Sequence, residues 1–140
     1  MKEQKPYGIF DYSELPIVKI EITGENATDE NFSTYLKEMA SVPNKAERYI
    51  TILDGRKASY LAAKYRIMQG KYIENNKERT EKQSIAAIFI APSFLQKTIL
   101  KAIFLVKPYP SPVFIVNNNE EALIKTTQLL EEEKRNQDNK

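Results

Sequence analysis

Strand-like and helix-like segments alternate from residue 17 almost to the end of the chain, and this order limits the fold more than any other feature of the sequence. The first strand-like segment is I-V-K-I-E-I, in which Val18, Ile20 and Ile22 share one face. A period of two predicts a half-buried strand. Strands that alternate with helices favour a mostly parallel sheet with helices packed on it. The strands expected in this part of the chain are 17–22, 49–54, 84–91 and 113–116.

The segments between these strands carry helical signals. Thr28 is expected to cap a helix that starts with two acids, and Asn residues at 117–119 are expected to cap the last helix. A long helix is expected from about 57 to 80, and another over 94–107.

The chain is expected to form one α/β domain over residues 1–140. Residues 7–12 predict an additional edge strand, which would form a hairpin with 17–22 across a turn that contains Pro16. The sheet is therefore expected to be mixed and mostly parallel, with four to five strands and about four helices. The polar ends, 1–6 and 134–140, are expected to be flexible tails.

Five stretches carry a resemblance to a known family. They are V-K-I-E-I-T-G, the helix start T-D-E-N-F, Y-I-T-I-L-D-G, S-I-A-A-I-F-I-A-P-S and S-P-V-F-I-V-N-N-N-E-E-A-L. Over roughly residues 15–132, the pattern resembles the STAS-like family of bacterial domains. That family is related in shape to anti-sigma-factor antagonists and, more loosely, to CRAL-TRIO lipid carriers. The resemblance implies a STAS-like fold and a regulatory bacterial module that acts through protein–protein interaction.

One motif of the family does not match. Phosphorylatable anti-sigma antagonists carry an Asp-Ser pair before a glycine at a helix start. In this chain Ser59 lies five residues beyond Asp54, so the resemblance does not extend to a phosphorylation switch.

The chain contains no histidine and no cysteine, which argues against catalysis. This composition excludes a Ser-His-Asp triad, a Cys-His pair and the usual zinc sites. No Gly-rich phosphate loop and no metal-like spacing of acids is present. We therefore expect a protein that is not an enzyme and that has no cofactor and no metal. An enzyme would need Asp54, Lys57, Ser59 or a tyrosine to act without imidazole.

The charge balance and the apolar stretches bear on the cellular setting. The chain has 21 basic and 19 acidic residues, a net charge of +2, which does not suit nucleic-acid binding. The N-terminal M-K-E-Q-K-P-Y-G lacks the apolar core of a signal peptide. No apolar stretch reaches the ~20 residues that span a bilayer. A cytoplasmic protein without a transmembrane segment is expected.

The stretch D-G-R-K-A-S, residues 54–59, follows an expected strand and opens the expected helix at 57. A helix N-terminus with nearby bases can bind an anion, and a serine there can be phosphorylated. The candidate anion or phosphorylation site consists of Asp54, Gly55, Arg56, Lys57 and Ser59. The alternative interpretation is a structural turn in which Asp54 caps the helix and the bases are solvated.

The helix at 94–107 offers a candidate interaction surface. On a helical wheel, Leu100 and Phe104 fall on the half expected to face solvent, next to Lys97 and Lys101. An exposed apolar pair among lysines suggests a dimer contact, a protein partner or a shallow membrane contact. Alternatively, a neighbouring element covers the pair.

A pocket is the second functional hypothesis. Tyr65, Met68, Tyr72 and Phe94, together with Phe104, are expected to line a space between the helices and the sheet. The leading interpretation is a regulatory protein-interaction module, with a protein partner or a second copy as its ligand. The alternative is a small carrier that binds an apolar or lipid-like molecule.

Overall fold

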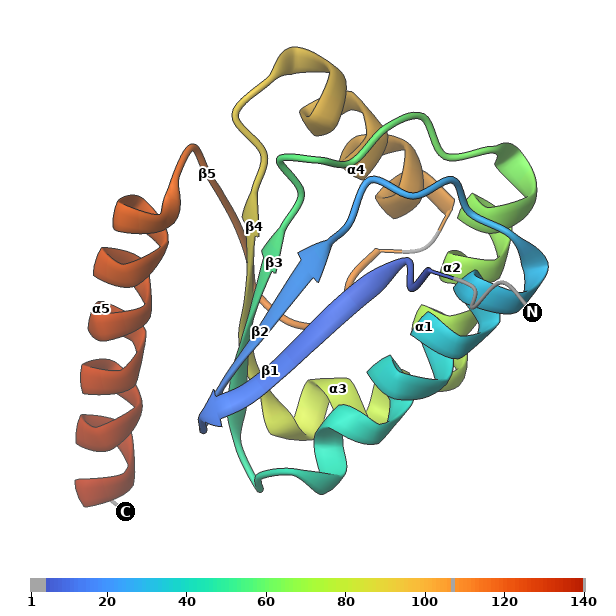
Figure 1. Ribbon diagram of the computed structural model, residues 1–140. Coiled ribbons are helices and arrows are strands. Elements are labelled where there is room, and N and C mark those ends of the chain that lie inside the picture. The colour runs from blue at the N-terminus through green and yellow to red at the C-terminus, as the bar shows by residue number, and fades with distance from the viewer. Residues whose placement is uncertain (1–4, 107, 140) are drawn as a thin grey trace.

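One five-stranded sheet organises the computed structural model, which describes residues 5–106 and 108–139. The strands lie side by side in chain order, with β1 antiparallel to β2 and every later pair parallel (Figure 1). This confirms the predicted α/β domain class and its mixed, mostly parallel sheet. The strands are β1 (Gly8–Glu14), β2 (Ile17–Ile22), β3 (Tyr49–Asp54), β4 (Ser84–Ile90) and β5 (Val113–Val116).

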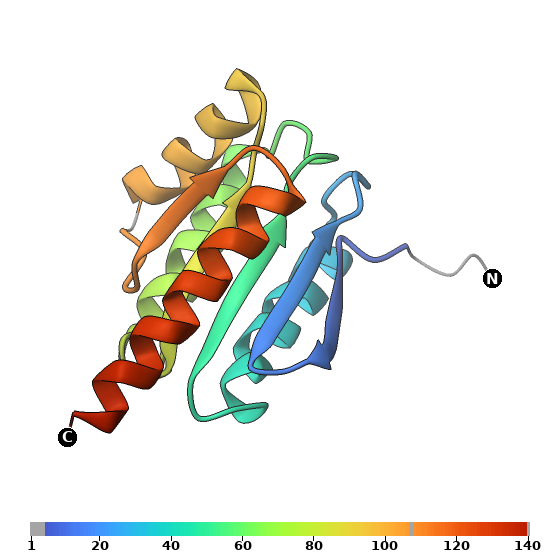
Figure 2. The same ribbon diagram turned by 90° about the vertical axis from the view of Figure 1, so that its left-hand side faces the viewer.

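The helices cover the two faces of the sheet unequally. Helices α1 to α4 lie on one face, and α5 lies alone on the other (Figure 1). Figure 2 shows α5 running across the middle of the sheet, with β1 and β2 to one side of it. The helices are α1 (Asp29–Ser41), the short 3₁₀ helix η1 (Val42–Asn44), α2 (Ala63–Asn75), α3 (Lys77–Gln83), α4 (Phe94–Val106) and α5 (Asn119–Asp138).

Side-chain caps fix the starts of three helices. The Thr28 hydroxyl accepts a hydrogen bond from the Asn31 amide, and the Asn31 side chain accepts one from the Thr28 amide, which completes a capping box. Asn118 accepts from the Glu121 amide at the start of α5. Both caps were predicted. Ser93 and Gln96 form a similar reciprocal pair at the start of α4.

The core has a separate layer on each face of the sheet. Val18, Ile20 and Ile22 of β2 point to the α1–α4 side and are buried, as the alternating pattern predicted. Ile50 and Ile88 belong to the layer under α5. Burial of this apolar surface is the main stabilising contribution to the fold.

The helical segment expected over 57–80 differs from the structure in two ways. Helix α2 begins at Ala63, because Leu61 is buried in the core while Ala62 has an extended backbone. At Asn76 the backbone leaves the helical region and separates α2 from α3. The described residues therefore form five α-helices, where about four were expected.

The two expected tails are only partly described. Residues 1–4 and 140 lie outside the described residues. The C-terminal part of the chain continues as α5 to Asp138, so most of the segment expected as a tail is helical. No helix within 5–106 or 108–139 has the length and apolar content needed to cross a bilayer.

Candidate functional site

A cavity of about 90 Å³ lies between the α1–α4 face of the sheet and the elements packed on it. Its floor comes from strands β2, β3 and β4, including Ile20, Thr51 and Phe89. Helices α1, α2 and α4 and the loop over 55–62 supply the walls. Protein cores are normally packed with few voids larger than a water molecule, so a cavity of this size is a candidate binding site.

None of the described residues that line the cavity is charged. Most are aliphatic or aromatic, and the polar groups are hydroxyls and amides. The polar lining residues are Tyr7, Tyr35, Thr51, Ser59, Gln69, Tyr72, Gln96 and Tyr109.

The lining tyrosines stay protonated at neutral pH. Burial raises the pKa of Tyr7 to about 12. Burial also raises the pKa values of Tyr35, Tyr72 and Tyr109 far above the ordinary value of a phenol. Desolvation disfavours the charged phenolate, which is the cause in each case. These side chains therefore present neutral hydroxyl groups and aromatic surface, not anions.

Thr51, in the centre of β3, is the exceptional polar residue of the cavity. It is 6% exposed, and its hydroxyl makes no hydrogen bond. The hydroxyl lies close enough to the Tyr109 phenol to oppose the rise of that pKa, but outside hydrogen-bond geometry. Buried side-chain hydroxyls nearly always form a hydrogen bond, and the Thr51 hydroxyl is an exception. It is therefore free to hydrogen-bond to a ligand in the cavity.

The loop over 55–62 closes one side of the cavity and is fixed by backbone contacts. Gly55 donates to the Ile90 carbonyl at the end of β4 (2.9 Å). A Cβ at Gly55 would lie 3.2 Å from that carbonyl oxygen, so glycine suits this close approach. The Gln96 side-chain amide donates to the Arg56 carbonyl (2.6 Å) and joins the loop to α4.

The candidate anion site at 54–59 does not have the predicted geometry. No helix starts there, because α2 begins at Ala63. The Arg56 guanidinium donates to both carboxylate oxygens of Asp54, and Lys57 pairs with Glu21 (2.9 Å). The Arg56 side chain lowers the pKa of Asp54, as expected for a carboxylate that accepts these hydrogen bonds. Both bases already have carboxylate partners.

The structure supports the turn interpretation for this stretch, with one difference. Asp54 does not cap a helix, but its carboxylate accepts from the Arg56 amide across the turn (3.0 Å). Ser59 is exposed at the rim of the cavity, and its phosphorylation stays a prediction.

The predicted orientation of α4 was wrong. Leu100 and Phe104 face the cavity, and the Phe104 ring lies 5.6 Å from that of Phe89. Lys97 is half-buried and Lys101 is exposed. The structure agrees with the alternative that a neighbouring element covers the pair, because α4 packs against α2 and the Phe104 ring centroid lies 6.0 Å from that of Tyr109 in the loop before β5.

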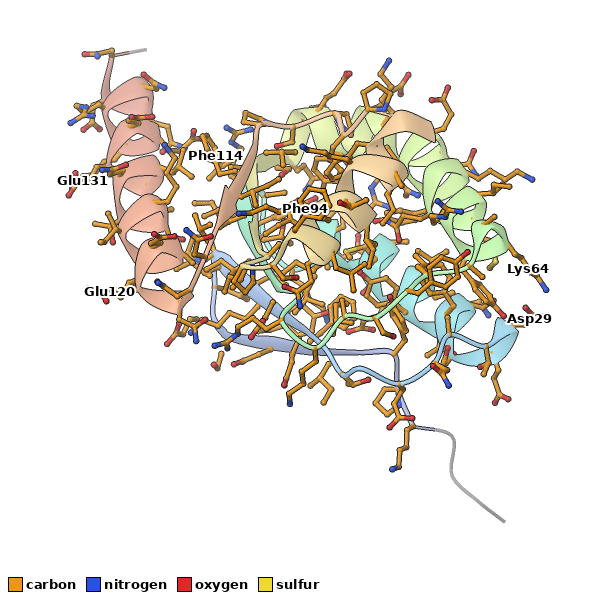
Figure 3. All side chains as sticks on the ribbon, turned by 90° about the horizontal axis from the view of Figure 1, so that it is seen from above. Asp29, Lys64, Phe94, Phe114, Glu120 and Glu131 are labelled. Atoms are coloured by element: carbon orange, nitrogen blue, oxygen red, sulfur yellow. The ribbon has the colours of Figure 1, made fainter. Side chains whose placement is uncertain are left out.

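The exposed apolar residues of α4 are instead those of its first turn. Phe94 is 85% exposed and Leu95 is 57% exposed. Figure 3 views the end of the molecule at which α4 begins, where Phe94 is labelled. The expected role of Phe94 in lining the pocket was therefore wrong, because this turn extends past the surface that α4 packs against.

Of the other predicted lining residues, Tyr72 and Phe104 line the cavity, whereas Tyr65 and Met68 do not. Tyr65 packs its ring on Phe32 and donates its hydroxyl to Asp29 (3.0 Å), near Lys64 in Figure 3. Met68 packs against the core layer on the same face without lining the cavity.

Sequence reasoning missed Thr51, Gln96 and Tyr109. The alternation of β3 places Thr51 on the same face as Tyr49 and Leu53, which gave a usable signal. The S-x-x-Q spacing of Ser93 and Gln96 is a capping-box pattern and gave another. Tyr109 lies in an irregular loop, and no local pattern indicates its direction.

Among the residues within 5–106 and 108–139, no group of acidic side chains is arranged to hold a metal ion. No protein-family model, no curated protein and no solved structure matches this chain. The site geometry and the sequence pattern therefore carry the functional argument.

Proposed function

We propose that this chain is a non-enzymatic binding module that holds a small, largely apolar molecule in the cavity between the sheet and helices α2 and α4. The observation that carries this proposal is a cavity of about 90 Å³ whose described lining has no charged residue. The absence of histidine from the sequence supports a binding role over acid–base chemistry.

The volume limits the size of the ligand. An apolar cavity of about 150 Å³ binds benzene, whereas sites for drug-sized molecules occupy about 300–1,000 Å³. This cavity, at about 90 Å³, is smaller than that benzene site, so it limits the ligand to at most one small ring. This narrows the predicted carrier from a lipid-like ligand to a small one.

Native mass spectrometry of freshly purified protein, followed by NMR titration with toluene, tests this proposal. Ala58 lines the cavity from the loop, and Ala58→Leu should reduce the space and weaken toluene binding at least about tenfold. Ala62 is exposed on the same loop and does not line the cavity, so Ala62→Leu is the matched control. Toluene binding that is equal in both variants would refute the proposal.

A second candidate function is protein–protein interaction through the first turn of α4. We propose it because Phe94 and Leu95 are consecutive, exposed and apolar. The STAS-like resemblance also supports a regulatory interaction module in the bacterial cytoplasm. The partner would be another protein or a second copy of this chain.

Light scattering over a concentration series separates this second function from the first. Phe94→Asp should abolish self-association without affecting toluene binding. Leu123 is also exposed but lies on α5, across the sheet, so Leu123→Asp is the control. A wild-type chain that stays monomeric would exclude the second copy, and an unchanged dimer in Phe94→Asp would exclude this surface.

A further inference from the structure

We infer that the cavity selects an uncharged ligand with one hydrogen-bonding group, and that Thr51 is the residue that binds this group. The inference rests on the proposed ligand-binding function and adds the chemistry of the ligand. It begins from the one hydroxyl on the cavity floor that has no partner, the Thr51 Oγ1 atom.

The position of Thr51 makes its unpaired hydroxyl significant. An unpaired buried hydroxyl is costly, and Thr51 lies on β3, the central strand, where water has little access. A ligand that hydrogen-bonds to Thr51 would remove this cost. Threonine both donates and accepts, so the ligand group can be a hydroxyl or a carbonyl.

Among the polar groups of the described lining, Thr51 stands out because its hydroxyl is fully buried and has no hydrogen-bond partner. Gln96, at the rim, already donates to the Arg56 carbonyl and accepts from the Ser93 amide. Tyr109, beside Thr51, is a neutral phenol that can add a second hydrogen bond to the same ligand group. Thr51 and Tyr109 therefore place two hydrogen-bonding groups side by side, and the other polar groups of the lining are contributed by other segments.

The charge of the lining excludes ionic ligands. A carboxylate or an ammonium group in this cavity would have no opposite charge among the described lining residues. Burying an unpaired ion is far more costly than burying a hydroxyl. Phenol has the expected size and one hydroxyl, toluene matches its shape without a hydrogen-bonding group, and benzoate adds a charge.

NMR titration with these three probes tests the inference on the wild-type protein, Thr51→Val and Thr51→Ser. The decisive quantity is the ratio of the toluene Kd to the phenol Kd. A substitution that changes only the size or shape of the cavity alters both Kd values alike and leaves this ratio unchanged. We expect Thr51→Val to lower this ratio about tenfold and Thr51→Ser, which keeps the hydroxyl, to preserve most of it. We expect benzoate to bind none of the three proteins.

The other outcomes separate this inference from the function on which it rests. If toluene binds and the ratio is the same in wild type and Thr51→Val, the cavity binds ligands but Thr51 does not select them. Benzoate binding as tight as phenol binding would also overturn the inference. If neither toluene nor phenol binds the wild-type protein, the proposed function fails and the inference fails with it.

Discussion

Replacing Thr51 by valine should stabilise the ligand-free protein. Valine keeps the β-branched shape that suits a strand and puts a methyl group where the unpaired hydroxyl lies. An unsatisfied buried polar group costs about 1–3 kcal/mol, and removing it recovers part of that cost. We expect a free energy of unfolding that is higher by about 1 kcal/mol. For a chain of this length, that corresponds to a Tm higher by about 4 °C.

Urea unfolding followed by far-UV circular dichroism measures this change, because the chain has no tryptophan to report by fluorescence. Thr126 provides the matched control. It is 1% exposed, but its hydroxyl donates to the Ala122 carbonyl (2.8 Å). Thr126→Val removes a hydrogen bond that exists, so it should leave stability unchanged or lower it by up to about 1 kcal/mol.

A urea midpoint that is lower for Thr51→Val than for the wild-type protein would refute this prediction. That result would mean that the Thr51 hydroxyl is bonded in the folded protein. A ligand could then bind the Thr51 hydroxyl only by breaking that existing hydrogen bond, and Thr51 would give no preference for phenol over toluene.

Three further predictions test the placement of individual side chains by the same unfolding assay. Phe104→Ala should destabilise the protein by about 2–3 kcal/mol, and Phe94→Ala by less than about 0.5 kcal/mol. The reverse order would mean that Phe104, not Phe94, faces solvent, as the helical wheel predicted. Gly55→Ala should cost about 1 kcal/mol, because its Cβ crowds the carbonyl at the end of β4; an unchanged midpoint would argue against this contact. Asp54→Asn should cost about 0.5 kcal/mol at pH 7. Because Arg56 lowers the folded-state pKa of Asp54, this difference should disappear as the pH falls through that pKa; a constant difference down to pH 2 would contradict the ion-pair explanation.

Local sequence signals predicted most of the strands and helix caps. The bounds expected for β2, β3 and β5 agree with the structure, because each strand is a short apolar run between clear turns. The Thr28 cap was also correct, since its partner Asn31 lies three residues away. These features depend on neighbours in sequence, so sequence reasoning can find them.

The candidate site was predicted poorly because its geometry depends on packing between distant segments. The apolar residues at 58, 61 and 62 have helical spacing, yet burial of Leu61 keeps this segment in a loop. Apolar residues surround most of α4, so periodicity alone could not identify its buried face. The cavity is space left by side chains from three strands, three helices and the segments between them, including Tyr109 in the loop before β5, and no single segment encodes it.

The hydrogen bond between the Gln96 side chain and the Arg56 carbonyl has a consequence for the kinetics of binding. It joins the loop over 55–62 to the first turn of α4 at the rim of the cavity. A ligand that enters between this loop and α4 would have to break this contact, so on that route the rate at which the contact opens would limit association. Affinity would then vary among ligands mainly through their dissociation rates.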